Sequence, residues 1–72
     1  MQFAIVIERS ANGFGAYVLD LPGCVAVAES EDEVRALIQE AIEFHLESLR
    51  EDSDPIPQPA ARVDYVDIPH AA

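Results

Sequence analysis

The sequence has no lysine and no tryptophan, and it contains a single cysteine, Cys24. Four arginines stand against fourteen aspartates and glutamates, and the formal net charge is −10 at pH 7. Surfaces that bind nucleic acid or anionic membranes need clustered Lys and Arg, so this composition argues against both kinds of partner. A small domain without an internal disulfide is typical of a reducing compartment, which predicts a cytoplasmic protein.

Long hydrophobic runs are also missing. No apolar run reaches the roughly 18 residues that span a bilayer, and no basic segment followed by an apolar one marks a secretion signal. Half of the 72 residues are nevertheless hydrophobic, which indicates a folded domain. A single core of this size rarely supplies more than ~3–5 kcal/mol, and charges of one sign repel each other in the compact state. We therefore expect self-association as a homodimer or a higher oligomer.

Alternating apolar residues predict strands over residues 3–8, 14–19, 24–28 and 62–68. Asn12-Gly13 favours a tight hairpin turn between the first two strands. Pro22-Gly23 is a turn signal before the third strand, and we expect Gly23 to have a positive φ. Pro55, Pro57 and Pro59 alternate in a stiff extended connector before the last strand.

A helix is predicted from about Glu31 to Arg50. Ser30 and Glu33 have the spacing of a capping box, and Glu31 to Glu33 place negative charge at the positive end of the helix dipole. Apolar residues recur at helical spacing on one side. Acidic residues occupy the other side at Glu40, Glu43 and Glu47.

The predicted order is therefore β-β-β-α-β, an α+β fold. A helix between strands suggests a crossover that places the last strand beside the first and parallel to it. The sheet would have one helix on one face. The first two strands carry apolar residues on both faces, so we expect a second chain to cover the other face or an edge.

Few residues suggest catalysis. His45 lies on the apolar side of the predicted helix, where a packed histidine is the simpler interpretation. Cys24 has no triad partner in the sequence pattern, so we expect it to be a buried, small apolar side chain. A two-metal nuclease needs carboxylates that converge from neighbouring strands. The candidate carboxylates are Glu8, Asp64 and Asp67. Whether they lie close enough together to share metal ions decides whether the chain could be such a nuclease.

The segment Gly15–Cys24 runs as an aromatic strand into Asp20-Leu21-Pro22-Gly23-Cys24, and it is followed by Ser30–Glu33, by an acidic helix with Glu43–Leu49, and by Asp54–Pro57. These motifs, in this order, resemble the HicB-like antitoxins over residues 1–69, with residues 70–72 as a short tail. The resemblance implies a truncated ribonuclease-H-like fold without the metal-binding acids of the nuclease. It also implies a non-enzymatic, cofactor-free module that neutralises a small RNA-cleaving toxin of the HicA type. Charge supports this expectation independently, because an RNA-binding toxin is basic and a strongly acidic partner would associate with it rapidly.

Many members of this family carry a C-terminal DNA-binding domain, and we expect none on this chain. Two surfaces are candidates for partner contact. One is the helix face with Glu40, Glu43 and Glu47. The other is the family signature with the neighbouring strand edge, which comprises Tyr17, Asp20, Leu21, Pro22, Gly23 and Cys24. Two alternatives to the antitoxin remain at this point: a divergent or vestigial ribonuclease-H-type nuclease, and a homo-oligomeric interaction domain without a toxin.

Overall fold

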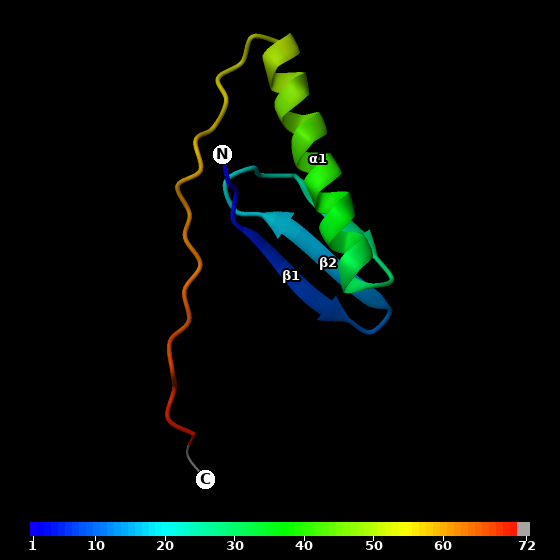
Figure 1. Cartoon of the computed structure of the whole chain (residues 1–72), viewed down its shortest axis with the longest axis vertical. Helices are drawn as coiled ribbons and strands as arrows, with labels where there is room; N and C mark the ends of the chain where they lie inside the picture. Colours follow the sequence, from blue (N-terminus) through cyan, green and yellow to red (C-terminus); the bar gives the residue numbers. More distant parts are fainter. Residues whose placement is uncertain (71–72) are drawn as a thin grey trace.

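The computed structural model describes residues 1–70 of the chain. The elements are β1 (Ile5–Ser10), β2 (Gly13–Val18), β3 (Val25–Ala28) and α1 (Glu31–Glu51), as Figure 1 shows. The strands form one antiparallel sheet in the order β1-β2-β3, and α1 packs on one of its faces. The predicted α+β class, the antiparallel strands and the helix are confirmed. The helix is not apolar enough to cross a membrane.

The hairpin between β1 and β2 closes with a two-residue turn at Ala11 and Asn12, so that Ser10 pairs with Gly13. Of the Asn12-Gly13 pair only the glycine has a positive φ, +150°. A side chain at Gly13 would collide with the carbonyl oxygen of Ala28 in the neighbouring strand. This glycine therefore allows β3 to approach the hairpin closely.

A β-turn over Leu21–Cys24 leads the chain from β2 into β3. The Cys24 N–H donates to the Leu21 carbonyl at 3.1 Å, and Gly23 has a φ of +84°. Proline at the second position and a positive-φ glycine at the third are the requirements of a type II turn. The positive φ expected at Gly23 is confirmed.

Both ends of α1 are capped. At the start, Ser30 Oγ accepts a hydrogen bond from the Glu33 N–H at 3.2 Å, which is the first half of the predicted capping box. The Glu33 carboxylate reaches back to the Ser30 hydroxyl, which donates to it at 3.2 Å. At the end, the Ser53 N–H donates to the Arg50 carbonyl at 3.1 Å and the Asp54 N–H donates to the Leu49 carbonyl at 2.9 Å. Ser53 itself is left-handed, with a φ of 57°. This arrangement is a Schellman motif, and it satisfies carbonyl groups that the helix leaves free.

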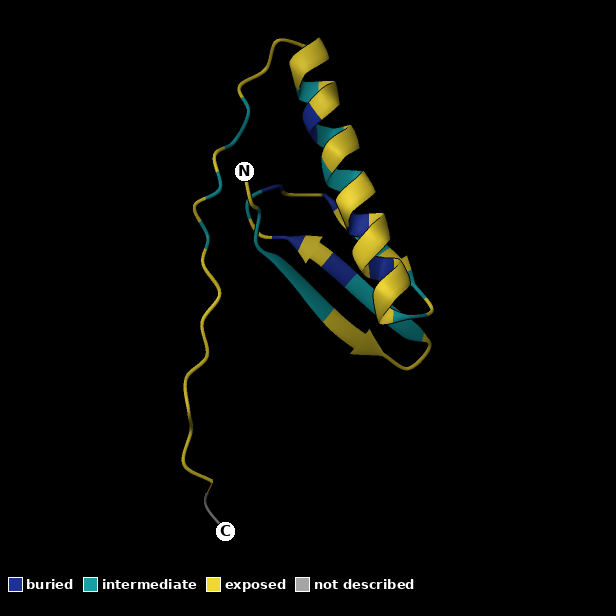
Figure 2. Cartoon of the chain, in the orientation of Figure 1, coloured by how far each residue is buried: buried dark blue, intermediate teal, exposed yellow. Residues whose placement is uncertain are grey.

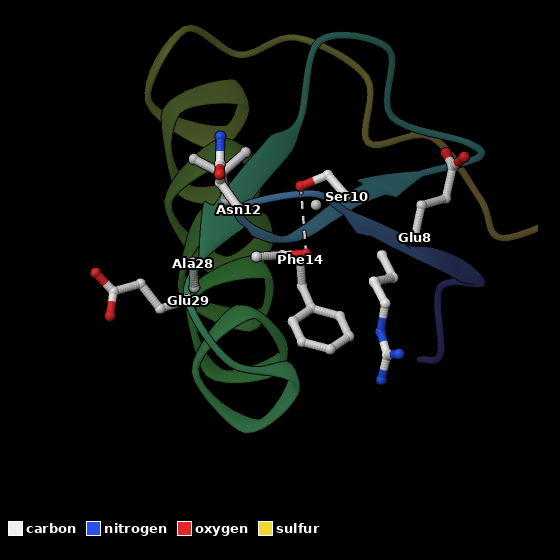
Figure 3. A pocket seen from close by; sticks show the side chains of 10 residues that line it. Glu8, Ser10, Asn12, Phe14, Ala28 and Glu29 are labelled. Carbon is white, nitrogen blue, oxygen red and sulfur yellow. Dashed lines mark hydrogen bonds between the residues drawn. The ribbon is translucent and has the colours of Figure 1, made fainter.

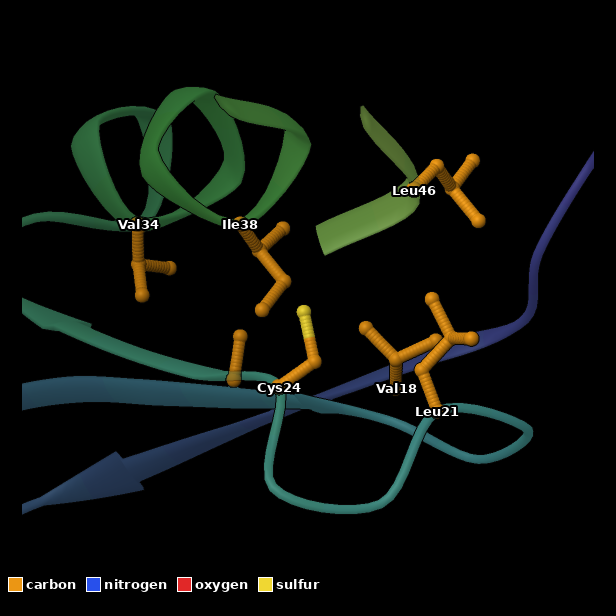
Figure 4. Packing of buried hydrophobic residues seen from close by; sticks show 7 residues of the cluster. Val18, Leu21, Cys24, Val34, Ile38 and Leu46 are labelled. Carbon is orange, nitrogen blue, oxygen red and sulfur yellow. The ribbon is translucent and has the colours of Figure 1, made fainter. Parts of the chain in front are cut away.

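The core lies between α1 and the sheet (Figure 4). Its fully enclosed side chains are Leu21, Val34 and Ile38, and the Cys24 thiol points toward the helix among them. Burial of Cys24 as a small apolar side chain was predicted and is confirmed. The opposite face of the sheet is open, and there Tyr17, Val25 and Val27 are exposed. In Figure 2 the buried residues are confined to the helix and to the sheet with its connections.

The predicted fourth strand does not form within this chain. After α1, residues 52–70 contain no strand, and the extended segment 62–70 descends away from the sheet (Figure 1). We call residues 62–70 the arm. The Asp20 carboxylate accepts hydrogen bonds from the Ala60 and Ala61 N–H groups, both at 3.0 Å, and so fixes the root of the arm. The β1 edge beside the arm consequently remains unpaired.

Candidate functional site

The outward face of α1 carries a mixed acidic and apolar ridge. Its members follow each other at spacings of three and four residues, which aligns them along one side of a helix. We call this set the acidic ridge: Leu37, Glu40, Phe44, Glu47 and Glu51.

The acidic ridge faces away from the core. Val34, Ile38 and Leu46 are the buried residues of α1 and lie on the opposite side. Phe44 is 75% exposed, and Leu37 is 41% exposed. A phenylalanine that folding leaves in water, between Glu40 and Glu47, offers an apolar anchor surrounded by negative charge.

The three predicted helix acids are all exposed, but the structure divides them. Glu40 and Glu47 belong to the acidic ridge. Glu43 lies around the helix toward β1, where it accepts a hydrogen bond from Gln39 Nε2 at 3.3 Å. Two of the three predicted acids therefore share a face with Phe44.

The second predicted surface, the signature segment, is only partly accessible. Leu21 and Cys24 are core residues at 0% and 5% exposure, and burial raises the pKa of the Cys24 thiol above its ordinary value. Asp20 is half-buried, and its carboxylate holds Ala60 and Ala61. The members that a partner could reach from outside are Tyr17, Pro22 and Gly23.

An open hollow of about 590 Å³ lies at the hairpin end of the sheet (Figure 3). Glu8 and Glu29 stand at its opposite sides, and the Arg9 guanidinium lies 5.5 Å from the centre of the Phe14 ring. Neither a cysteine nor a histidine lines this hollow. It therefore offers no thiol or imidazole for catalysis.

The carboxylates that decide the nuclease alternative do not converge. Within residues 1–70, no group of three His, Cys, Asp or Glu side chains is placed so that it could hold a metal ion. Glu8 lies on β1, whereas Asp64 and Asp67 are on the exposed arm. This arrangement lacks the clustered ligands of two-metal catalysis.

Sequence reasoning missed two features of the site. The exposure of Phe44 could have been predicted from the sequence. Phe44 is an aromatic residue outside the apolar stripe of the helix, and it has Glu40 and Glu47 on either side at helical spacing. The role of Asp20 had no such signal, since its hydrogen-bond partners are 40 and 41 residues further along the chain.

Comparisons with known proteins bear on what these surfaces do. A family model described as the HicB-like antitoxin of a bacterial toxin-antitoxin system matches residues 3–70. A 14.9 kDa protein from the rep-hol intergenic region of Haemophilus phage HP1 is 32% identical over 69 residues, which cover 96% of this chain and 52% of the phage protein. A UPF0150 protein of Archaeoglobus fulgidus is 48% identical over 50 residues, which cover 65% of this chain and 70% of the relative. The chain thus spans about half the length of the phage relative.

A solved structure resembles the fold. A chain of the "HicA3 and HicB3 toxin-antitoxin complex" superposes with a TM-score of 0.71 at 27% sequence identity. The match covers 83% of this chain and 70% of that chain.

Proposed function

Because this chain belongs to the HicB-like antitoxin family, we propose that it neutralises a small, basic, RNA-cleaving toxin of the HicA type by direct protein–protein contact. The observation that carries the proposal is the acidic ridge, on which the exposed Phe44 lies between Glu40 and Glu47. The similar solved fold, which comes from a complex of HicA3 with HicB3, supports a toxin as the partner. The module acts by occupying the toxin's surface, with no chemical step and no cofactor, and we place it in the cytoplasm.

The acidic ridge suits a basic partner on two counts. Its carboxylates, within a chain of net charge −10, accelerate encounter with a positively charged protein. Aromatic side chains at the centre of an interface commonly carry a large part of the binding free energy. The exposed signature residues Tyr17, Pro22 and Gly23 form the alternative contact surface, and the same experiments distinguish it.

The first experiment measures binding kinetics with a purified toxin of the HicA type. Charge reversal of Glu40, Glu43 and Glu47 to arginine should lower the association rate at least tenfold and weaken its salt dependence. The control variant reverses Glu8, Glu29 and Asp54, which are equally exposed but lie off the acidic ridge. Equal losses in both variants would show that only net charge matters, and unchanged binding in the first would move the contact to the signature segment.

The second experiment tests the apolar anchor. Phe44→Ala should raise the dissociation rate by tenfold or more, since truncation of an interface anchor costs about 2 kcal/mol or more. Val27→Ala is the matched control, because Val27 is 78% exposed on the opposite face of the molecule. Toxin rescue in growing cells should fail with the Phe44 variant and persist with the Val27 variant. Full neutralisation by both variants would refute the acidic ridge as the site.

The proposal also covers the fourth strand of the truncated ribonuclease-H-like fold. We propose that residues 62–68 form a fourth strand, parallel to β1, when the edge of the sheet is completed. Val63 borders a hollow with Phe3 and Ala4, whereas Tyr65 borders one with Ile5 and Ile7. These neighbours follow each other in the same order along the arm and along β1, which supports a parallel pairing.

A further inference from the structure

The arm is an extended segment whose apolar side chains are largely exposed. Tyr65, Val66 and Ile68 are 89%, 80% and 78% exposed. The radius of gyration is 14.8 Å, whereas a compact chain of this length has one of about 11 Å. The long axis of 55 Å also exceeds the roughly 31 Å length of α1. A segment with this pattern needs a sheet edge from elsewhere to bury its side chains.

The β1 edge offers such a place. β1 is an outer strand of the sheet, and α1 packs mainly over β2 and β3. A groove of about 460 Å³ consequently opens between α1 and β1, and its apolar members include Phe3, Ile5 and Ile42. The six residues of β1 and the seven residues 62–68 have matching lengths of about 20 Å when extended.

Charge is compatible with the arm as the occupant of this edge. Arg9, Arg35 and Arg50 line the groove or the adjoining hollow, and so do Glu31 and Glu43. Arg35 is already paired with Glu31 at 3.3 Å, whereas Arg9 and Arg50 have no ion pair within residues 1–70. These two arginines can pair with Asp64 and Asp67 of the arm.

Within one chain, the arm does not pair with the β1 edge. Its root is fixed by the Asp20 carboxylate at Ala60 and Ala61, and the preceding Pro55, Pro57 and Pro59 stiffen the connector. Beyond that root, the nine residues of the arm extend about 30 Å, which is enough to cross to the edge of a neighbouring copy. Exchange of identical elements between two copies preserves the parallel pairing and leaves no arm or edge unpaired.

We propose that two copies of this chain exchange arms, so that residues 62–68 of each copy pair with the β1 edge of the other and fill its groove. The proposal rests on the fourth strand proposed above and adds that the strand is supplied by the second copy. It is independent of the toxin-binding site, because the acidic ridge lies on the outward face of α1.

Disulfide trapping distinguishes the source of the strand. In a Cys24→Ala background, Ala4→Cys and Val63→Cys are introduced together, since both positions border the same hollow. Arm exchange predicts a covalent dimer after mild oxidation. An internally bridged monomer would overturn exchange while keeping the fourth strand, and the absence of any disulfide would overturn both. Mixing chains that carry only Ala4→Cys with tagged chains that carry only Val63→Cys should give the mixed dimer.

Sedimentation of the full-length chain provides the second test. The unsubstituted chain should sediment as a dimer at micromolar concentration. Val66→Pro removes a backbone N–H and should weaken dimerisation at least tenfold, whereas Val66→Thr keeps the N–H and the branched side chain and should remain dimeric. A monomeric parent chain would overturn the proposal. A dimer that is indifferent to Val66→Pro would also overturn it, because it would place the interface on the open sheet face with Val25 and Val27.

Discussion

β1 and the arm are composed of the same kinds of residue, yet they have different structures. Each combines branched apolar side chains with charged ones, as Ile5-Val6-Ile7-Glu8-Arg9 does in β1 and Arg62-Val63-Asp64-Tyr65-Val66-Asp67-Ile68 does in the arm. β1 is joined to β2 by a two-residue turn, and its Ile5 and Ile7 pack against the core. The arm follows a proline-rich connector, and its Ile68 remains 78% exposed. A strand-like sequence therefore forms a strand only where a neighbouring strand is available to pair with it.

We call the sheet with its connecting turns and α1 the body. The largest expected effect comes from comparing the same kind of side-chain truncation in the body and in the arm. Leu21→Ala should cost about 2–5 kcal/mol of unfolding free energy, because the side chain is fully enclosed. Ile68→Ala should change it by less than about 0.5 kcal/mol under conditions where the chain is monomeric. Urea denaturation followed by circular dichroism measures both values. Similar losses in the two variants would mean that the arm is packed against its own body.

The next effect compares two glycines. Gly23→Val should cost more than about 1 kcal/mol, because the φ of +84° strains a branched residue although no atom lies near the added side chain. Gly15→Val is the control, since Gly15 lies on β2 without a positive φ and has only ordinary contacts. Thermal unfolding of both variants provides the test. An unchanged melting temperature for Gly23→Val would show that the type II turn adapts.

A stabilising change is expected at the C-terminal end of α1. Ser53→Gly should add about 0.5–1 kcal/mol, because glycine adopts the left-handed conformation of the Schellman motif without strain. Each 1 kcal/mol corresponds to roughly 4–8 °C in the melting temperature of a domain of this size. The control Ser48→Gly, inside α1, should lower stability by about 0.5 kcal/mol. A decrease for both variants would contradict the role of Ser53.

The smallest effect concerns pH and Cys24. Burial raises the pKa of its thiol above the ordinary value of 9.0, so the folded chain retains a proton that the unfolded chain releases. Stability from this residue is therefore present below pH 9.0 and is lost as the pH rises through the folded pKa. Denaturation at pH values on either side of 9.0 should show a steeper decline for the parent chain than for Cys24→Ala. Parallel pH profiles would contradict this assignment.

The elements of the body were predictable because their signals are local. Ser30 with Glu33 and Pro22-Gly23 each specify a cap or a turn within a few residues. Asn12-Gly13 locates the hairpin, whose two-residue turn lies one position earlier, at Ala11 and Asn12. The apolar stripe of α1 follows from the helical repeat alone. The family resemblance was carried by the same short motifs, and it is confirmed by the match over residues 3–70.

What escaped prediction depends on the positions of distant residues. The arm has a strand pattern, but no sequence rule states whether its edge lies in the same chain. Leu21 was predicted only as a candidate for partner contact, whereas the turn that it begins directs its side chain into the core. Burial of a loop residue depends on where the helix packs, and that is not encoded within the loop.

The hydrogen bonds from Ala60 and Ala61 to Asp20 have a far longer sequence separation than the pairings of the sheet. Paired residues of the sheet are close in sequence, and even Phe14 and Ala28 are only 14 positions apart. Such short loops close rapidly, so the sheet and α1 should assemble early. The Asp20 contact spans 40 residues and includes the whole helix. We therefore expect the contact at the root of the arm to form after the sheet and α1, so that the edge with which the arm pairs is selected last.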